Sequence, residues 1–98
     1  MAPEDRIAVE RVQTGVRMEK RLVKVLKGLA EYYDLSLGDL LEGIVLHAFE
    51  GKSPFEEASL ARIRELKHFY GLSLGSAASH RLTEAGARRP PARARRRA

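Results

Sequence analysis

The side chains best suited to catalysis or metal binding are few and widely separated in this sequence. The three histidines, His47, His68 and His80, form no HExxH motif and no pair at i and i+4, and the chain contains no cysteine. Zinc sites and metalloprotease sites need closer and more regular ligand spacing than this. Ser73 lies in a GLSLG string, which lacks the G-x-S-x-G spacing of a nucleophile elbow. We therefore expect no enzymatic activity, no catalytic residue, no metal and no cofactor.

Basic residues are the chemically active group that does cluster. Residues 6–27 contain seven Lys or Arg and two acids, a net charge of +5, whereas residues 28–50 contain five acids and no Lys or Arg, a net charge of −5. The last twelve residues contain six Arg and no acid. Such clusters attract polyanions, because each neutralised phosphate releases counterions. The alternative interpretation is that these are ordinary solvated faces and a solubilising terminus.

The element that presents the first basic cluster is a predicted strand over residues 12–18. Every second residue there is apolar or β-branched, which is the period of a half-buried strand. Gln13, Gly15 and Arg17 lie between them, on the polar side. No second strand pattern exists in the chain, and an unpaired strand leaves its backbone groups unsatisfied. The simplest partner is the same strand of another copy, so we expect an antiparallel pairing and a homodimer.

Two helices are predicted after this strand. From Leu22 the apolar residues recur at i, i+3, i+4 and i+7, which predicts a helix from about Glu19 to Tyr33. Ser36 followed by Asp39 is a capping-box-like start for a second helix. Gly51 marks its end, in a left-handed conformation that glycine adopts without strain. The apolar stripes of the strand and both helices form the predicted dimer core: Val12, Thr14, Val16, Met18, Leu22, Val25, Leu26, Leu29, Leu40, Leu41, Ile44 and Val45.

A third helix is predicted over residues 54–70. Ser53 is a favourable N-cap, Pro54 is suited to the first helical position, and Glu56 completes a capping box. These signals predict that a new helix begins a few residues after Gly51.

A fourth, weaker helix is expected from a repeat. The LSLG string at residues 35–38 recurs at residues 72–75, after similar aromatic pairs. Ser73 is therefore expected to cap a short helix, and residues 52–86 to form an accessory helix-turn-helix hairpin packed on the dimer. Coincidental reuse of a common turn is the alternative.

The order strand, helix, helix from Val12 to about Phe49 resembles the ribbon-helix-helix DNA-binding proteins of the MetJ/Arc/CopG kind. The resemblance rests on the alternating strand, an Ala30 late in the first helix and the Ser36 cap. It implies a mostly α-helical chain with one short β-strand, forming an intertwined homodimer, to which the C-terminal hairpin is an addition. It also implies that the paired ribbon enters the major groove of double-stranded DNA.

The resemblance assigns base reading to the polar side of the strand, namely Gln13, Gly15 and Arg17. Glutamine and arginine offer paired hydrogen bonds that suit adenine and guanine edges. It also implies a phosphate site at the start of the second helix, where free backbone N–H groups meet the helix dipole. The predicted phosphate contacts are Arg11, Lys20, Ser36, Leu37, Gly38, Arg88, Arg89, Arg93, Arg95, Arg96 and Arg97.

These inferences divide the chain into four regions. We expect a flexible N-terminal arm (1–10), a ribbon-helix-helix DNA-binding and dimerisation domain (11–51), the accessory hairpin (52–86) and a disordered Arg-rich tail (87–98). No apolar run is long enough to span a membrane, and no secretory signal is present, so a cytoplasmic location is expected.

The expected function is that of a prokaryotic transcriptional regulator, a repressor that is nucleoid-associated when bound to DNA. One alternative is an antitoxin or assembly adaptor in which residues 52–86 bind a protein partner. Another is a four-helix interaction module with no role on DNA.

Overall fold

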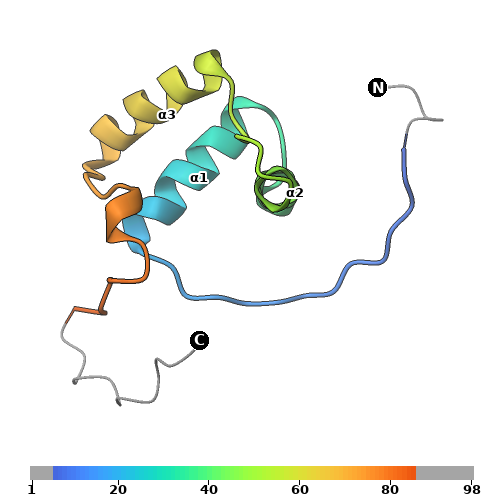
Figure 1. Cartoon of the computed structure of the whole chain (residues 1–98), viewed down its shortest axis with the longest axis horizontal. Coiled ribbons are helices and arrows are strands. Elements are labelled where there is room, and N and C mark those ends of the chain that lie inside the picture. Colours follow the sequence, from blue (N-terminus) through green and yellow to red (C-terminus); the bar gives the residue numbers. More distant parts are fainter. Residues whose placement is uncertain (1–5, 86–98) are drawn as a thin grey trace.

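Three α-helices follow an extended N-terminal segment in the computed structural model, which describes residues 6–85. They are α1 (Lys20–Tyr32), α2 (Leu37–Phe49) and α3 (Glu57–Tyr70), and a short 3-10 turn, η2 (Ser76–Ala78), comes after them. Figure 1 shows α3 running back alongside α1 in the opposite direction, with α2 crossing them and seen end-on. Within the described residues no helix is both long enough and apolar enough to cross a membrane.

The predicted ribbon-helix-helix fold is wrong, because residues 6–85 contain no β-strand. Residues 12–18 are extended, as their alternating pattern indicated, but they remain unpaired. No backbone hydrogen bond joins residues 6–18 to another segment of the described chain. An extended segment becomes a strand only when its N–H and C=O groups bond to a neighbouring strand. The structure is mostly α-helical, which is the part of the predicted fold class that agrees with it.

The first two helices begin and end close to the predicted residues. The Glu19 carboxylate caps α1 by accepting a hydrogen bond from the Leu22 N–H at 2.9 Å. Ser36 caps α2, as predicted, because its Oγ accepts the Asp39 N–H at 3.0 Å. Gly51, with a φ of 72°, has the predicted left-handed conformation after α2.

The predicted start of the third helix is wrong by three residues. Ser53 does not cap α3; its hydroxyl instead donates to the Phe55 carbonyl at 3.1 Å. The helix begins at Glu57. Phe55 packs against the cluster of Leu29, Ala30 and Leu40, and this contact holds the chain before Glu57 in a non-helical conformation.

The repeated LSLG junction has the same turn in both copies, but only the first leads into an α-helix. The residue before each string is left-handed, Asp34 with a φ of 57° and Gly71 with a φ of 71°. The amides of Leu35 and Leu72 donate to carbonyls five residues earlier, at 2.9 and 2.8 Å. After Leu72 the predicted fourth helix is wrong, since only the 3-10 turn η2 forms.

The small core lies mainly between α1 and α3. Leu29 is 1% exposed, the deepest large side chain in the described chain. Leu66 of α3 approaches Gly28 of α1 so closely that a Cβ on Gly28 would lie 3.0 Å from its Cδ2. At the far end of the pair, the Tyr33 hydroxyl is hydrogen-bonded to the buried Ser59 hydroxyl. The two helices are therefore packed as a closed pair.

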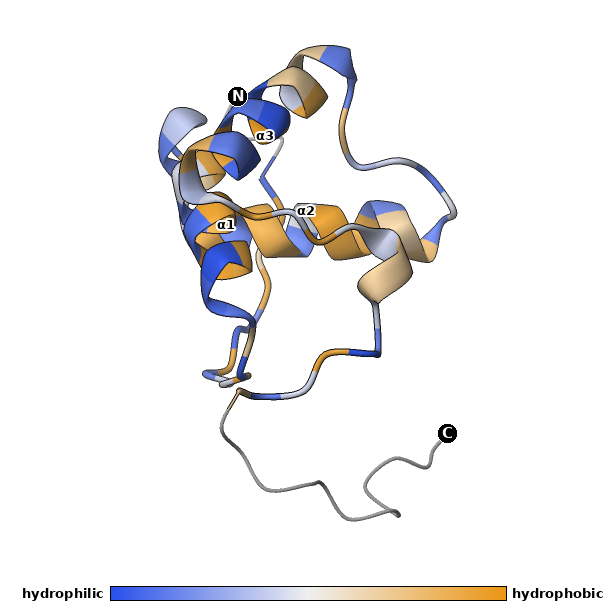
Figure 2. Ribbon diagram, turned by 90° about the vertical axis from the view of Figure 1, so that its left-hand side faces the viewer, coloured by the Kyte–Doolittle hydropathy of each residue, from blue (hydrophilic) through white to orange (hydrophobic). Residues whose placement is uncertain are grey.

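Helix α2 packs less completely. Leu40 is its only buried residue, although most of its residues are apolar. Val45, Leu46 and Phe49 are 42%, 65% and 81% exposed. Figure 2 shows this helix as a largely hydrophobic cylinder that projects away from the α1–α3 pair. Much of its apolar surface is thus left without a partner among residues 6–85.

Candidate nucleic-acid interface

The predicted base-reading residues lie on an exposed, extended segment that leads into α1. From here on, the arm means residues 6–18, a segment that overlaps the predicted N-terminal arm of residues 1–10. Gln13, Gly15 and Arg17 are all exposed, and a side chain at Gly15 would meet no atom within 4 Å. In Figure 1 the arm leaves the start of α1 and passes beneath α2 as a stretch of chain without helix or strand. Its polar side chains are therefore accessible to a large partner.

Arg11 joins the arm to α2 through a two-pronged ion pair with Glu42. Its Nε and Nη2 donate to the two carboxylate oxygens of Glu42 at 2.8 and 2.7 Å. This hydrogen bonding raises the pKa of Arg11 and lowers the pKa of Glu42, and the charge of Asp39 adds to the effect on Arg11. The basic arm thus lies beside acidic α2, which means that the two charged halves of the sequence are not held apart in space.

Arg17 makes the second contact of the arm, an ion pair with Glu84. Glu84 belongs to the segment of residues 72–85 that follows α3, which we call the strap. The hydrogen bond from Arg17 to Glu84 raises the pKa of the guanidinium. Both side chains remain largely in water, 82% and 61% exposed. Exposed ion pairs stabilise proteins little, so a competing anion can displace Glu84 at small cost.

The basic side chains of α1 differ in how many contacts they make with other groups of the described chain. Arg21 donates to the Gly71 carbonyl and to Glu19, each at 2.9 Å, which ties the start of α1 to the end of α3. Lys24 lies 5.8 Å from the centre of the Tyr70 ring. Lys20 is exposed, and no acidic group of the described chain lies within salt-bridge distance of it. Of these side chains, Lys20 is the one most available to a phosphate.

The predicted phosphate site at the start of α2 has the expected backbone geometry. The first intrahelical bond runs from the Leu40 N–H to the Ser36 carbonyl, and Ser36 Oγ is already bonded to the Asp39 N–H. The amides of Leu37 and Gly38 are therefore the unused donors of the first turn. Through Glu42 the structure brings Arg11 to this same part of α2. The exposed Asp39 carboxylate opposes an anion there.

The structure divides the predicted dimer core into three groups. Leu22, Leu26, Leu41 and Ile44 are half-buried, and Thr14 is exposed. Val25, Leu29 and Leu40 are buried inside the single chain. By contrast, Val12, Val16, Met18 and Val45 are exposed. The six tail arginines from Arg88 to Arg97 lie outside the described residues.

Two acids that contact the arm had no signal in the sequence. Glu42 and Glu84 are 31 and 67 residues away from the arginines they bind. Contacts at such separations depend on the packed fold and on no local pattern. Within residues 6–85 no three His, Asp or Glu side chains come together as metal ligands would.

Comparison with family models, with curated proteins and with solved structures finds no match to this chain.

Proposed function

We propose that the protein binds double-stranded DNA as a homodimer, with sequence preference, and regulates transcription. The observation that carries this proposal is the arm, an extended segment on which Gln13 and Arg17 are both exposed. The arm and α1 together bring the +5 charge of residues 6–27 to a partner. Positive charge of this density attracts the phosphate backbone, and the polar side chains supply contacts to bases.

The spacing of the two side chains fits the repeat of a duplex. In an extended chain Gln13 and Arg17 point to the same side and lie about 13 Å apart, at roughly 3.3 Å per residue. Base pairs follow one another at about 3.4 Å, so this distance corresponds to about four base pairs. Paired hydrogen bonds from glutamine suit adenine, and those from arginine suit guanine. An arm lying along the major groove would therefore specify two bases about four positions apart.

The acidic partners of the arm set the cost of DNA binding. Arg11 and Arg17 must exchange Glu42 and Glu84 for groups on DNA, and both ion pairs are exposed. Since exposed pairs are weak, the exchange costs little. Replacing Glu84 with glutamine removes both a competitor and a negative charge, so it should tighten DNA binding about two- to fivefold.

The homodimer is supported by the apolar surface of α2. Leu46 and Phe49 are mostly exposed, and a side chain at Gly43, in the middle of the helix, would meet no atom within 4 Å. Glycine inside a helix costs stability relative to alanine, and no contact with the described part of the chain explains it here. A second copy packed on α2 would cover these residues. Two arms in one dimer would then contact two half-sites.

Selection from a random-sequence duplex library tests the proposal. The full chain should enrich a motif, and Arg17→Ala should lose preference at one base position per half-site by about tenfold or more. Arg64→Ala, which removes the same charge from an exposed site on α3, is the matched control and should enrich the wild-type motif. Failure to enrich any motif, or equal loss in both variants, would exclude sequence-dependent reading by the arm.

A protein partner for residues 52–86 is the second candidate. It is supported by Phe69 on α3 and Leu82 on the strap, which are 77% and 51% exposed. An antitoxin or adaptor of this kind should co-purify with a stoichiometric protein. Phe69→Ser should abolish that complex and Arg17→Ala should leave it intact; the reverse pattern would exclude this role.

A further inference from the structure

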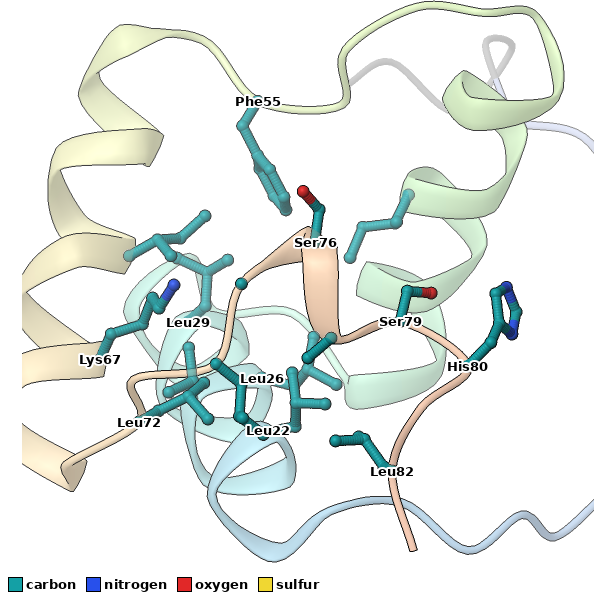
Figure 3. Close-up of a pocket in the computed structure, with 16 residues that line it drawn as sticks. Leu22, Leu26, Leu29, Phe55, Lys67, Leu72, Ser76, Ser79, His80 and Leu82 are labelled. Atoms are coloured by element: carbon teal, nitrogen blue, oxygen red, sulfur yellow. The ribbon is translucent and has the colours of Figure 1, made fainter.

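An apolar cavity of about 460 Å³ lies between α1, α2, α3 and the strap. Its walls include Leu22 and Leu26 of α1, Ile63 of α3, and Leu72 and Leu82 of the strap. Figure 3 shows the strap and η2 passing over one side of the cavity, with Phe55 at its far end. The volume falls within the range of about 300 to 1,000 Å³ that is typical of small-molecule sites.

The cavity is a half-open groove beside the core. Leu29 is the only large side chain of the described residues that is almost fully enclosed, and it lines the cavity. Leucine and isoleucine make up much of the wall. Covering such apolar surface with another apolar group is favourable, because it removes that surface from water. The cavity therefore favours an occupant with an apolar body.

Lys67 of α3 adds a charge to this apolar wall. Its side chain is half-buried and lines the cavity, and Figure 3 shows it among the labelled residues of the wall. Within the described residues, no acidic oxygen lies within 4.0 Å of its ammonium group. An apolar segment of a second copy in the cavity would cover this charge without pairing it, which is costly. A carboxylate would pair it.

We propose that this cavity binds an amphipathic carboxylate, with the carboxylate on Lys67 and the hydrocarbon between α1 and the strap. A saturated fatty acid such as dodecanoate has the matching polarity, a carboxylate at one end of a hydrocarbon chain. The hydroxyls of Ser76 and Ser79, which also line the cavity, supply further hydrogen-bond donors at the strap.

The strap provides the way in. The backbone hydrogen bonds from residues 73–85 are all local, such as Ala78 N–H to the Gly75 carbonyl and Ser79 N–H to the Ser76 carbonyl. His80 adopts a left-handed conformation, with a φ of 66°, which is unfavourable for a residue other than glycine. A segment held this way opens at lower cost than the helices beneath it. The strap can therefore lift while α1 and α3 stay packed.

Calorimetric titration of the full chain with dodecanoate, below its micelle concentration, tests the proposal. Dodecanoate should bind with one site per chain, and dodecanol should bind about tenfold more weakly because it lacks the charge. Lys67→Met should lower the affinity for dodecanoate to that for dodecanol and leave dodecanol binding unchanged. Lys52→Met, in the exposed loop after α2, is the matched control and should bind both probes like the wild type.

A cavity-filling variant locates the site independently of charge. Ala78→Phe should fill the cavity from the strap and abolish binding of both probes, while far-ultraviolet circular dichroism keeps the wild-type helix signal. The proposal is overturned if dodecanoate does not bind, if Lys67→Met binds it as tightly as the wild type, or if Ala78→Phe retains binding. It is also overturned if Ala78→Phe dissociates a dimer, because a second copy would then fill the cavity. None of these outcomes depends on DNA binding.

Discussion

The α1–α3 pair differs from the arm and α2 in how far the side chains are covered by the rest of the described chain. In the pair, Leu29 is 1% exposed and Gly28 leaves room for Leu66. In α2, by contrast, Leu46 and Phe49 are mostly in water, and the arm touches the rest of the chain through the ion pairs of Arg11 and Arg17. The α1–α3 pair meets closely within the described chain. The arm and α2 present apolar and basic surface that a partner would cover.

The helix sequences explain this difference. Helix α1 places apolar residues on one side and lysines on the other, and α3, with Leu40 of α2, packs against its apolar side. Helix α2 is apolar on more than one side, and one neighbour cannot cover it. Helices that are apolar all round are normally buried on all sides. The exposed side of α2 is thus an apolar surface that the described chain leaves uncovered.

Truncation of one leucine in each region should give the largest contrast. Leu29→Ala should lower the free energy of unfolding by about 3 kcal/mol, because it opens a cavity in the centre of the core. Leu46→Ala should change it by less than about 0.5 kcal/mol in dilute protein, since the side chain is already in water. Urea denaturation followed by circular dichroism measures both. Similar losses in the two variants would show that α2 is as enclosed as α1.

Two exposed phenylalanines distinguish the surfaces of α2 and α3. Phe49→Ser should raise the dimer dissociation constant about tenfold or more, because Phe49 lies on the surface that we assign to the second copy. Phe69→Ser on α3 is equally exposed in the single chain and should leave the dissociation constant unchanged. Sedimentation equilibrium over a concentration series measures both constants. A strictly monomeric wild type would rule out the proposed dimer.

Two glycines compare how tightly the regions are packed. Gly43→Ala should stabilise the isolated chain by about 0.5 to 1 kcal/mol, because it raises helix propensity where space is open. Gly28→Ala should gain less or be destabilising, because its Cβ would press on Leu66. Thermal unfolding at low protein concentration gives both values. A larger gain at Gly28 than at Gly43 would contradict the described packing.

The cap of α1 should give the smallest effect, visible as a pH dependence. The hydrogen bond from the Leu22 N–H lowers the pKa of Glu19 in the folded chain. Its stabilisation is therefore present above the ordinary carboxyl pKa and is lost as the pH falls through the lowered value. Glu19→Gln should flatten the decline of the urea midpoint below about pH 4.5, whereas Glu31→Gln, exposed on the same helix, should not. Equal slopes for wild type and Glu19→Gln would exclude the cap.

Short sequence patterns predicted the features that depend on hydrogen bonds between neighbouring residues. Ser36 with Asp39 identified the start of α2, and Gly51 identified its end, because capping depends on neighbours within a few residues. The alternation at residues 12–18 predicted the backbone of a half-buried strand, but the described chain forms no strand there. It did not show whether that backbone would be paired, because pairing depends on a second segment that the described chain does not provide.

Contacts between residues far apart in the sequence could not be predicted from such short patterns. The two LSLG strings form the same turn, yet only one starts a helix, because Leu72 is drawn into the core and the chain stays extended after it. Ser53 had the features of an N-cap, but Phe55 reaches the core and delays α3. The Arg17–Glu84 pair and the cavity beside Lys67 likewise arise only once the helices are packed.

The salt dependence of DNA binding tests the role of the arm most directly. Fluorescence anisotropy with a labelled duplex gives the dissociation constant at several salt concentrations, and the slope of the logarithmic plot reports the phosphates neutralised. We expect Arg11→Gln, which removes a proposed phosphate contact of the arm, to weaken binding and to reduce the slope by about one for each arm, while Arg64→Gln leaves both unchanged. A wild-type chain without salt-dependent binding, or equal slopes for the two variants, would contradict DNA binding by the arm.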